Sequence, residues 1–314
     1  MPLDPVLQKF LGALAAAKGE GTRDTSVDAR RRELAEFLGL SGPPAGQVAS
    51  ETVRIGVAGV ERALRVYTPE ALGTDDAPAL LFFHGGGLVA GDLDTHDGIC
   101  RALCRASGIR ILSFDYPLAP EARFPQALEE CVQTAVALAR DARRWRIQEG
   151  AFLVGGDSAG ANLAAVLCQE LRVGPAPTPD VIAGQFLLCP ILDYAGMSAS
   201  KRSFGKGYLL DQETLDHDLR HYLPQGIDAS DPRISPLRAP SLEGLATACI
   251  HTAEYDPLRD EGNAYAERLR DAGVRATYYC HPGMVHLFYG MAAILPYARQ
   301  AFARMGEDIR GLLP

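Results

Sequence analysis

The chain has 314 residues, of which 47% are hydrophobic and 22% charged, and its formal net charge is −8. This is the composition of a soluble globular protein, and the acidic balance argues against a general nucleic-acid binder, which needs a basic surface. No apolar run approaches the roughly 20 residues that span a bilayer, so we expect no membrane span.

The first 50 or so residues are predicted to form helices and loops. Asp4 precedes any basic residue, so the charged start of a secretory signal is missing, and we expect a cytoplasmic protein. A second helix is expected over residues 28–38, where Arg30, Arg31 and Arg32 are interpreted as a solvated helix face. The first helix is expected to be amphipathic, with these apolar residues on one face: Val6, Leu7, Phe10, Leu11 and Leu14.

From residue 51 the pattern changes to strands that alternate with helices. A hairpin is expected around residues 58–61, and residues from about 190 to 231 form a mixed, helix-leaning interruption. The alternation predicts an α/β protein with a mostly parallel sheet and helices on both faces. The strands are expected at 51–57, 62–67, 80–83, 109–114, 151–154, 185–189, 247–253 and 276–280. The helices are expected at about 95–107, 125–145 and 259–272, and from about 159 and 291.

Residues 156–160 read Gly-Asp-Ser-Ala-Gly and stand between an expected strand and an expected helix. The pattern G-x-S-x-G at such a junction is typical of the nucleophile elbow of serine hydrolases. A serine hydroxyl is a weak nucleophile, so it must be exposed and close to a base. The pattern alone also fits an ordinary glycine-bounded turn, and the flanking strand and helix are what favour Ser158 as the nucleophile.

A base and an acid are sought among the polar residues that follow strands, because chemistry in open α/β sheets collects at the carboxyl ends of strands. His286 is the expected base, because it lies in a glycine-containing loop after the last strand, and His281 is its closest rival. Asp256 is the expected acid, and Glu254 could substitute for it. The order serine, aspartate, histidine is that of α/β-hydrolases.

Residues 84–87 read His-Gly-Gly-Gly after another expected strand. Consecutive glycines let backbone N–H groups face inward, so Gly85, Gly86 and Ala159 are the expected donors to an oxyanion. The glycines could instead form a tight turn or bind a phosphate, but neither glycine-rich phosphate-binding pattern is present.

Seven cysteines form no C-x-x-C pair, and those in apolar segments are interpreted as small core residues. Cys100 and Cys104 share one face of an expected helix, but no neighbouring histidine completes a zinc set. We therefore expect neither disulfides, nor a metal, nor a cofactor.

Together these motifs resemble the hormone-sensitive-lipase-like family of α/β-hydrolases, the bacterial carboxylesterases related to that lipase. The resemblance covers most of the chain. The residues that carry it, besides the elbow at 156–160 and His286, are Leu3-Asp4-Pro5, residues 84–87 with Gly91-Asp92, residues 116–121, Phe124-Pro125, residues 162–164 and residues 256–262.

The resemblance implies an α/β-hydrolase fold, a triad of Ser158, His286 and Asp256, and a helical cap made of residues 1–50 and about 193–231. Residues 51–314 would form the catalytic domain. A homodimer is also compatible with the resemblance. Three residues depart from the family pattern and put the pocket shape in question: Leu88, Ala161 and Leu287.

The expected function is hydrolysis of carboxylic esters through an acyl-enzyme on Ser158, with activity that falls in acid as the base is protonated. Short acyl chains are expected, because Phe204, Tyr208, Leu209 and Leu210 of the cap would close the pocket over a small group. Two alternatives stay open. One is a lactone or aryl-amide hydrolase with the same triad, and the other is a small-ligand receptor without activity.

Overall fold

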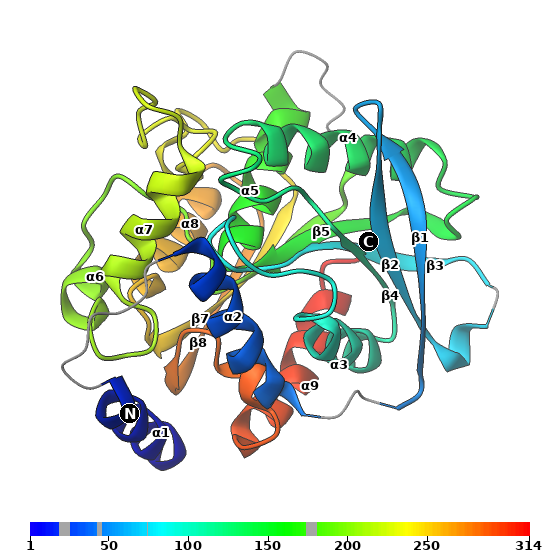
Figure 1. Cartoon of the computed structure of the whole chain (residues 1–314). Helices are drawn as coiled ribbons and strands as arrows, with labels where there is room; N and C mark the ends of the chain where they lie inside the picture. Colours follow the sequence, from blue (N-terminus) through cyan, green and yellow to red (C-terminus); the bar gives the residue numbers. More distant parts are fainter. Residues whose placement is uncertain (19–25, 43–45, 74, 174–180) are drawn as a thin grey trace.

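The computed structural model describes residues 1–18, 26–42, 46–73, 75–173 and 181–314, and its core is one eight-stranded sheet (Figure 1). The strand order is β1-β2-β4-β3-β5-β6-β7-β8, with antiparallel pairing of β2 to both β1 and β4 and parallel pairing elsewhere. The expected hairpin and the mostly parallel sheet are therefore confirmed. The strands are β1 (Val48–Val57), β2 (Val60–Pro69), β3 (Ala77–Phe83), β4 (Arg110–Phe114), β5 (Ile147–Asp157), β6 (Gly184–Leu188), β7 (Thr247–Tyr255) and β8 (Ala276–Val285).

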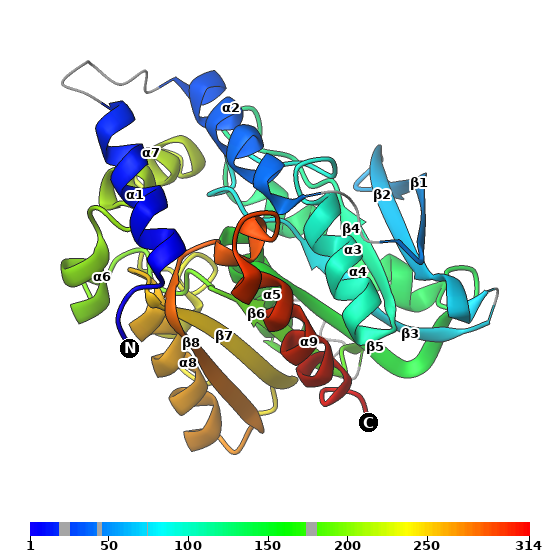
Figure 2. The same ribbon diagram turned by 90° about the horizontal axis from the view of Figure 1, so that it is seen from below.

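Helices cover both faces of this sheet because its strands are apolar on both sides. In β3, Leu81 and Phe83 pack in one core and Leu80 and Phe82 in the other, as alternation along a strand requires. The first core is completed by α4, α5 and α8, and the second by α3 and α9 (Figure 2). The helices are α1 (Pro5–Lys18), α2 (Val27–Leu38), α3 (Asp97–Ser107), α4 (Gln126–Arg140), α5 (Ala159–Val173), α6 (Ala199–Phe204), α7 (Gln212–Tyr222), α8 (Arg259–Asp271) and α9 (Pro296–Arg310).

Two boundaries near the C-terminus differ from the expectation. Strand β8 continues to Val285, so His286 follows the strand directly instead of lying within a longer loop. The last helix begins at Pro296, since residues 288–291 form a short 3-10 turn first. Strand pairing explains the first difference, because Tyr255 of β7 still pairs with Val285 of β8 beyond a register shift.

The interruption after β6 contains α6 and α7, which lie on the same side of the molecule as α1 and α2 (Figure 1). Asp193, at the start of the interruption, accepts two hydrogen bonds from Arg238, which follows it in the chain, at 2.7 and 3.0 Å. The buried ammonium of Lys201 on α6 lies 3.2 Å from Glu261 on α8, where burial raises the pKa of the carboxyl to about 8. Within the described residues, no helix is long and apolar enough to cross a membrane.

The interpretation of Arg30 and Arg31 as a solvated face is wrong. Arg31 donates to the backbone oxygens of Val89 and Ala119 and to the carboxylate of Glu121. Arg30 pairs with Asp218 of α7. These contacts join α2 to the loops after β3 and β4 and to the interruption, at the end of the sheet where the candidate site lies.

Candidate active site

The sharp turn between β5 and α5 places Ser158 at the carboxyl end of the sheet. Ser158 has φ +53°, which strains a residue with a side chain and holds its hydroxyl away from the strand. The flanking glycines permit the turn, because a Cβ at Gly156 or Gly160 would lie 2.3 or 2.0 Å from the carbonyl oxygen of Phe83. The sequence pattern at this junction therefore has a steric cause.

The carboxyl ends of β5, β7 and β8, which lie at one edge of the sheet, bring the predicted triad residues together. His286 Nε2 lies 3.1 Å from Ser158 Oγ, and His286 Nδ1 lies 2.7 Å from Asp256 Oδ2. A carboxylate only accepts, so Nδ1 donates to Asp256 and Nε2 is left to accept the serine proton. The other oxygen of Asp256 accepts from the backbone N–H of Leu258 at 2.8 Å, and the carboxylate is fully buried. The histidine is thus fixed in the tautomer that a general base needs.

The rivals for these positions have other partners. Glu254 accepts from the N-terminal ammonium and from the backbone N–H of Gly283. His281 lies inside β8, where burial and the neighbouring His251 lower its pKa to about 2. It contacts His251 at 3.0 Å and the hydroxyl of Tyr297 at 3.1 Å. Both groups therefore belong to the structural framework.

The glycine loop after β3 requires one correction to the expected oxyanion donors. The N–H of Gly85 donates to Asp157 Oδ1 at 2.8 Å, so it is not available to an oxyanion. Within the described residues, the N–H groups of Gly86, Gly87 and Ala159 donate to no protein acceptor. All three residues line the cavity above Ser158. The donor set that fits the structure is therefore Gly86, Gly87 and Ala159.

Asp157 holds the glycine loop from beneath. Its fully buried carboxylate also accepts from the hydroxyl of Tyr289 at 3.1 Å. Burial alone would raise the pKa of Asp157, but His96, His84 and the Tyr289 hydroxyl outweigh it, so the pKa lies below its ordinary value. The effect of His96 on Asp157 is electrostatic, because its Nε2 lies 3.5 Å from the carboxylate and makes no well-aligned hydrogen bond. An ionised Asp157 thus fixes Gly85.

His84 supports the same loop from its first position. Its ring stacks on Tyr116 with centroids 4.3 Å apart, and the tyrosine hydroxyl donates to the carbonyl oxygen of His84 at 2.6 Å. Burial and the neighbouring His96 lower the pKa of His84 to about 4, so the ring is neutral at physiological pH. The two motifs at residues 84–87 and 116–121 therefore act as one packed unit.

A cavity of about 480 Å³ opens above Ser158. It is lined by Leu209 and Leu287, as expected, but among the described residues the lining does not include Leu88, Phe204 or Tyr208. Leu88 is fully buried in the core, and Phe204 and Tyr208 pack on Tyr255 at 5.4 and 5.5 Å. The expected pocket roles of these three residues are therefore wrong.

The sequence reasoning missed most of the cavity wall. The first helix was expected to be amphipathic, but an amphipathic pattern does not distinguish a helix face that packs in a core from one that lines a cavity. A polar part of the wall combines charged residues from α2 and α7. The wall residues not anticipated from the sequence include Phe10, Leu14, Arg30, Glu33, Leu34, Glu36, Phe37, Leu40, Tyr194 and Asp218.

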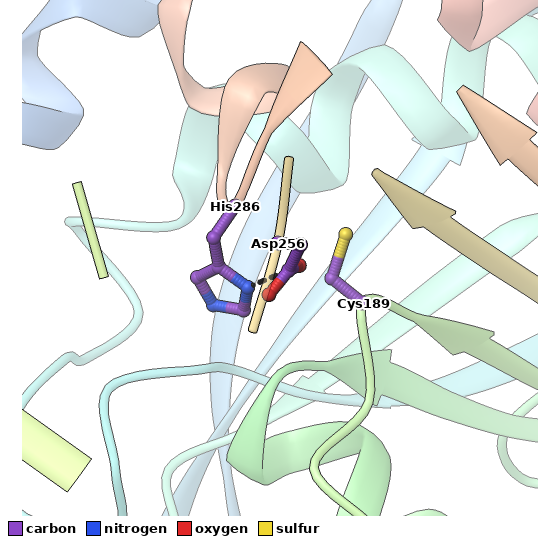
Figure 3. Close-up of side chains that lie close together, drawn as sticks. All are labelled: Cys189, Asp256 and His286. Carbon is purple, nitrogen blue, oxygen red and sulfur yellow. Dashed lines mark hydrogen bonds and ion pairs between the residues drawn. The ribbon is translucent and has the colours of Figure 1, made fainter. Parts of the chain in front are cut away.

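Among the residues that the structure describes, two groups contain side-chain types that bind metals. The thiol of Cys189 lies beside Asp256 and His286 (Figure 3), and Cys249, His251 and Asp308 form the second group, each with ligand atoms within 4.8 Å. Burial, and then Asp256, raises the pKa of Cys189 well above its usual value, and burial raises that of Cys249 to about 12. A metal binds the thiolate, so an ion would have to displace the proton of either thiol in order to bind there. The geometry of Cys189, Asp256 and His286 favours acid–base chemistry.

Known proteins share this arrangement. The family model described as alpha/beta hydrolase fold matches residues 80–290. The chain belongs to this family. It is 39% identical to the carboxylic ester hydrolase LipN of Mycobacterium tuberculosis, over 92% of this chain and 77% of LipN. It is 32% identical to the ethyl acetate hydrolase of Pseudomonas putida, over 99% of both chains. The expected membership among the hormone-sensitive-lipase-like α/β-hydrolases is thereby confirmed.

The fold of these α/β-hydrolases is also conserved in solved structures. An ester hydrolase from the metagenome of Lake Arreo, complexed with a phosphonate, matches with a TM-score of 0.93 at 32% identity, over 98% of each chain. The expected α/β-hydrolase fold is confirmed by this match and by the sheet order described above.

Proposed function

We propose that this α/β-hydrolase is a serine carboxylesterase. The observation that carries the proposal is the hydrogen-bonded series from Asp256 through His286 to Ser158 at the floor of a cavity. Its relatives include a carboxylic ester hydrolase and an ethyl acetate hydrolase, which have the same reaction class.

The reaction would proceed in two steps. His286 Nε2 takes the proton of Ser158 as its oxygen attacks the acyl carbon, and then returns that proton to the leaving alcohol. Water then enters, loses a proton to the same nitrogen and cleaves the acyl-enzyme. Asp256 stabilises the imidazolium in both steps, because its buried carboxylate already accepts from Nδ1. In this mechanism no step requires a metal or a cofactor.

The tetrahedral intermediates carry negative charge on the former carbonyl oxygen. We assign its stabilisation to the N–H groups of Gly86, Gly87 and Ala159. Ala159 is the first residue of α5, so the positive end of that helix dipole adds to the effect. Removing one such donor typically lowers kcat about 100-fold to 1000-fold.

We propose that residues 1–50 and 193–231 form a cap over the site, since α1, α2 and α7 all contribute to the cavity wall. The cavity of about 480 Å³ lies in the lower half of the range of roughly 300–1000 Å³ for small-molecule sites. Esters with short acyl chains therefore remain the proposed substrates. We assign the limit on acyl-chain length to the apolar residues that α1 and α2 contribute to the cavity wall, instead of to Phe204 and Tyr208.

We also propose that the protein works in the cytoplasm, because all seven cysteines are free, as a reducing compartment favours. The homodimer proposed from the family resemblance can be tested by light scattering of the purified protein. A mass of one chain would contradict it.

The function is tested with p-nitrophenyl esters from acetate to palmitate, with Ser158→Ala beside the parent. We expect turnover of short esters that is lost in the variant. A lactone and a p-nitroanilide are included, and a preference for either would replace the ester by that substrate. Binding of an ester without turnover in the parent would favour the receptor alternative instead.

A further inference from the structure

A buried ion pair forms part of the cavity wall. Arg30 on α2 donates through Nε and Nη2 to the carboxylate of Asp218 on α7, at 3.1 to 3.3 Å. The two side chains are 15% and 5% exposed. His217 also contacts Asp218, with Nδ1 3.0 Å from Oδ1. Burying two charges in this way costs desolvation energy that a pair of apolar side chains would avoid. The presence of this ion pair in a mostly apolar cavity wall therefore indicates a functional role.

The pair lies directly against the glycine loop. A Cβ at Gly87 would be 1.9 Å from Asp218 Oδ2, so the carboxylate touches the backbone of a proposed oxyanion donor. Within the part of the chain that the structure describes, no acceptor pairs with Nη1 of Arg30, and Arg30 lines the cavity. Arg30 therefore offers the cavity a cationic hydrogen-bond donor, and its partner Asp218 contacts Gly87 of the glycine loop.

We propose that Arg30, held by Asp218, recognises a second oxygen in the substrate, so that the enzyme prefers esters that carry an uncharged ether, hydroxyl or carbonyl oxygen. This inference rests on the proposed esterase function. The oxygen is uncharged because the carboxylate of Asp218 already balances the charge of Arg30, and Glu36 adds a further carboxylate to the same cavity wall. An anionic group would meet net repulsion there, whereas a neutral acceptor gains the guanidinium hydrogen bond.

The experiment compares esters that differ by one oxygen in place of a methylene. The acyl pair is p-nitrophenyl methoxyacetate and p-nitrophenyl butanoate, and the alcohol pair is 2-methoxyethyl butanoate and butyl butanoate. The measured quantity is the ratio of kcat/KM within each pair, for the parent and for Arg30→Met/Asp218→Leu. Dividing the parent ratio by the variant ratio cancels the different chemical reactivity of the two esters.

We expect the ratio for at least one pair to fall about tenfold or more in the double variant, since a hydrogen bond from a charged donor is lost. The pair that responds identifies the side of the substrate that faces Arg30. The double change leaves no unpaired buried charge, which favours folding. Arg30→Lys, which keeps the charge opposite Asp218 but loses the guanidinium fork, should lower the same ratio and serves if the double variant does not fold.

Arg62→Met/Glu130→Leu is the matched control, because it removes another arginine–carboxylate pair, at 2.6 and 2.9 Å, whose arginine is half-buried and whose carboxylate is buried. Neither residue belongs to the described cavity wall. Its ratios should equal those of the parent. Turnover of all four esters with both ratios unchanged in the Arg30 variants would overturn this inference alone. No turnover of any ester by the parent would overturn the proposed function and this inference together.

Discussion

The glycine loop gives a sharp test, because Gly87→Ala adds one carbon at a defined place. Gly87 has φ +67°, and the new Cβ would lie 1.9 Å from Asp218 Oδ2. Real Cβ contacts are not shorter than 3.0 Å, so residue 87 and the carboxylate of Asp218 must separate by about 1.1 Å, which is 3.0 minus 1.9. Asp218 is held by Arg30, and we therefore expect much of this movement to occur in the loop.

A displacement of about 1 Å in a catalytic group can lower the rate about 100-fold, and loss of an oxyanion donor lowers it by a similar or larger factor. We therefore expect kcat of Gly87→Ala to fall at least about 100-fold, with a much smaller change in KM. The left-handed backbone adds roughly 1–2 kcal/mol to the cost in stability. Gly108→Ala is the control, because Gly108 has φ +71° and a Cβ there would meet nothing within 4 Å.

The assay measures kcat and KM with p-nitrophenyl butanoate and the free energy of unfolding in urea for both variants. Gly108→Ala should lose stability and keep its kcat, while Gly87→Ala should lose both. If kcat of Gly87→Ala stays within about threefold of the parent, the assignment of this loop to oxyanion binding is wrong.

Three further predictions follow from the same structure. Asp157→Ala removes the acceptor of the Gly85 N–H, so kcat with p-nitrophenyl butanoate should fall about tenfold or more. Asp157→Asn keeps one acceptor oxygen and should retain much of the parent kcat. Equal kcat values in the two variants would contradict this role of Asp157. The low pKa of His281, about 2, keeps it neutral in the fold, whereas the unfolded chain takes up a proton below about pH 6.5, so stability is lost as pH falls. From about pH 7.5 to about pH 5, urea unfolding of the parent should lose roughly 2 kcal/mol more than that of His281→Asn, and parallel losses would refute the assignment. Phe37→Ala enlarges the cavity, so kcat/KM for p-nitrophenyl decanoate relative to butanoate should rise several-fold, and an unchanged ratio would show that Phe37 does not limit chain length.

The catalytic geometry follows from sequence because it depends on topology. Ser158, Asp256 and His286 each stand just after a strand, and parallel neighbouring strands bring their carboxyl ends to one edge of the sheet. Local sequence is enough to find such positions, as Gly156 and Gly160 show by permitting the close approach to β3. The family and the fold could therefore be predicted without coordinates.

The details that failed depend on contacts between distant segments. Asp157, at the end of β5, accepts the hydrogen bond of the Gly85 N–H, which follows β3. This bond decides which N–H groups of the glycine loop are left to face the cavity. Arg30 and Asp218 are 188 residues apart, and a charged residue on a helix is normally read as solvent-exposed. Neither partner reveals the other by pattern. The aromatic residues of the interruption were misplaced for the same reason, since Tyr255 of β7 holds them away from the cavity.

If Ser158 is the nucleophile and His286 activates it, a reagent that reacts with activated serines should label Ser158 covalently. The parent, Ser158→Ala and His286→Ala are incubated with a fluorophosphonate, and each intact mass and the labelled peptide are determined by mass spectrometry. We expect a single adduct on Ser158 in the parent, no adduct in Ser158→Ala, and labelling slowed by several orders of magnitude in His286→Ala. Rapid labelling of another residue, or ester turnover by a parent that takes up no label, would contradict it.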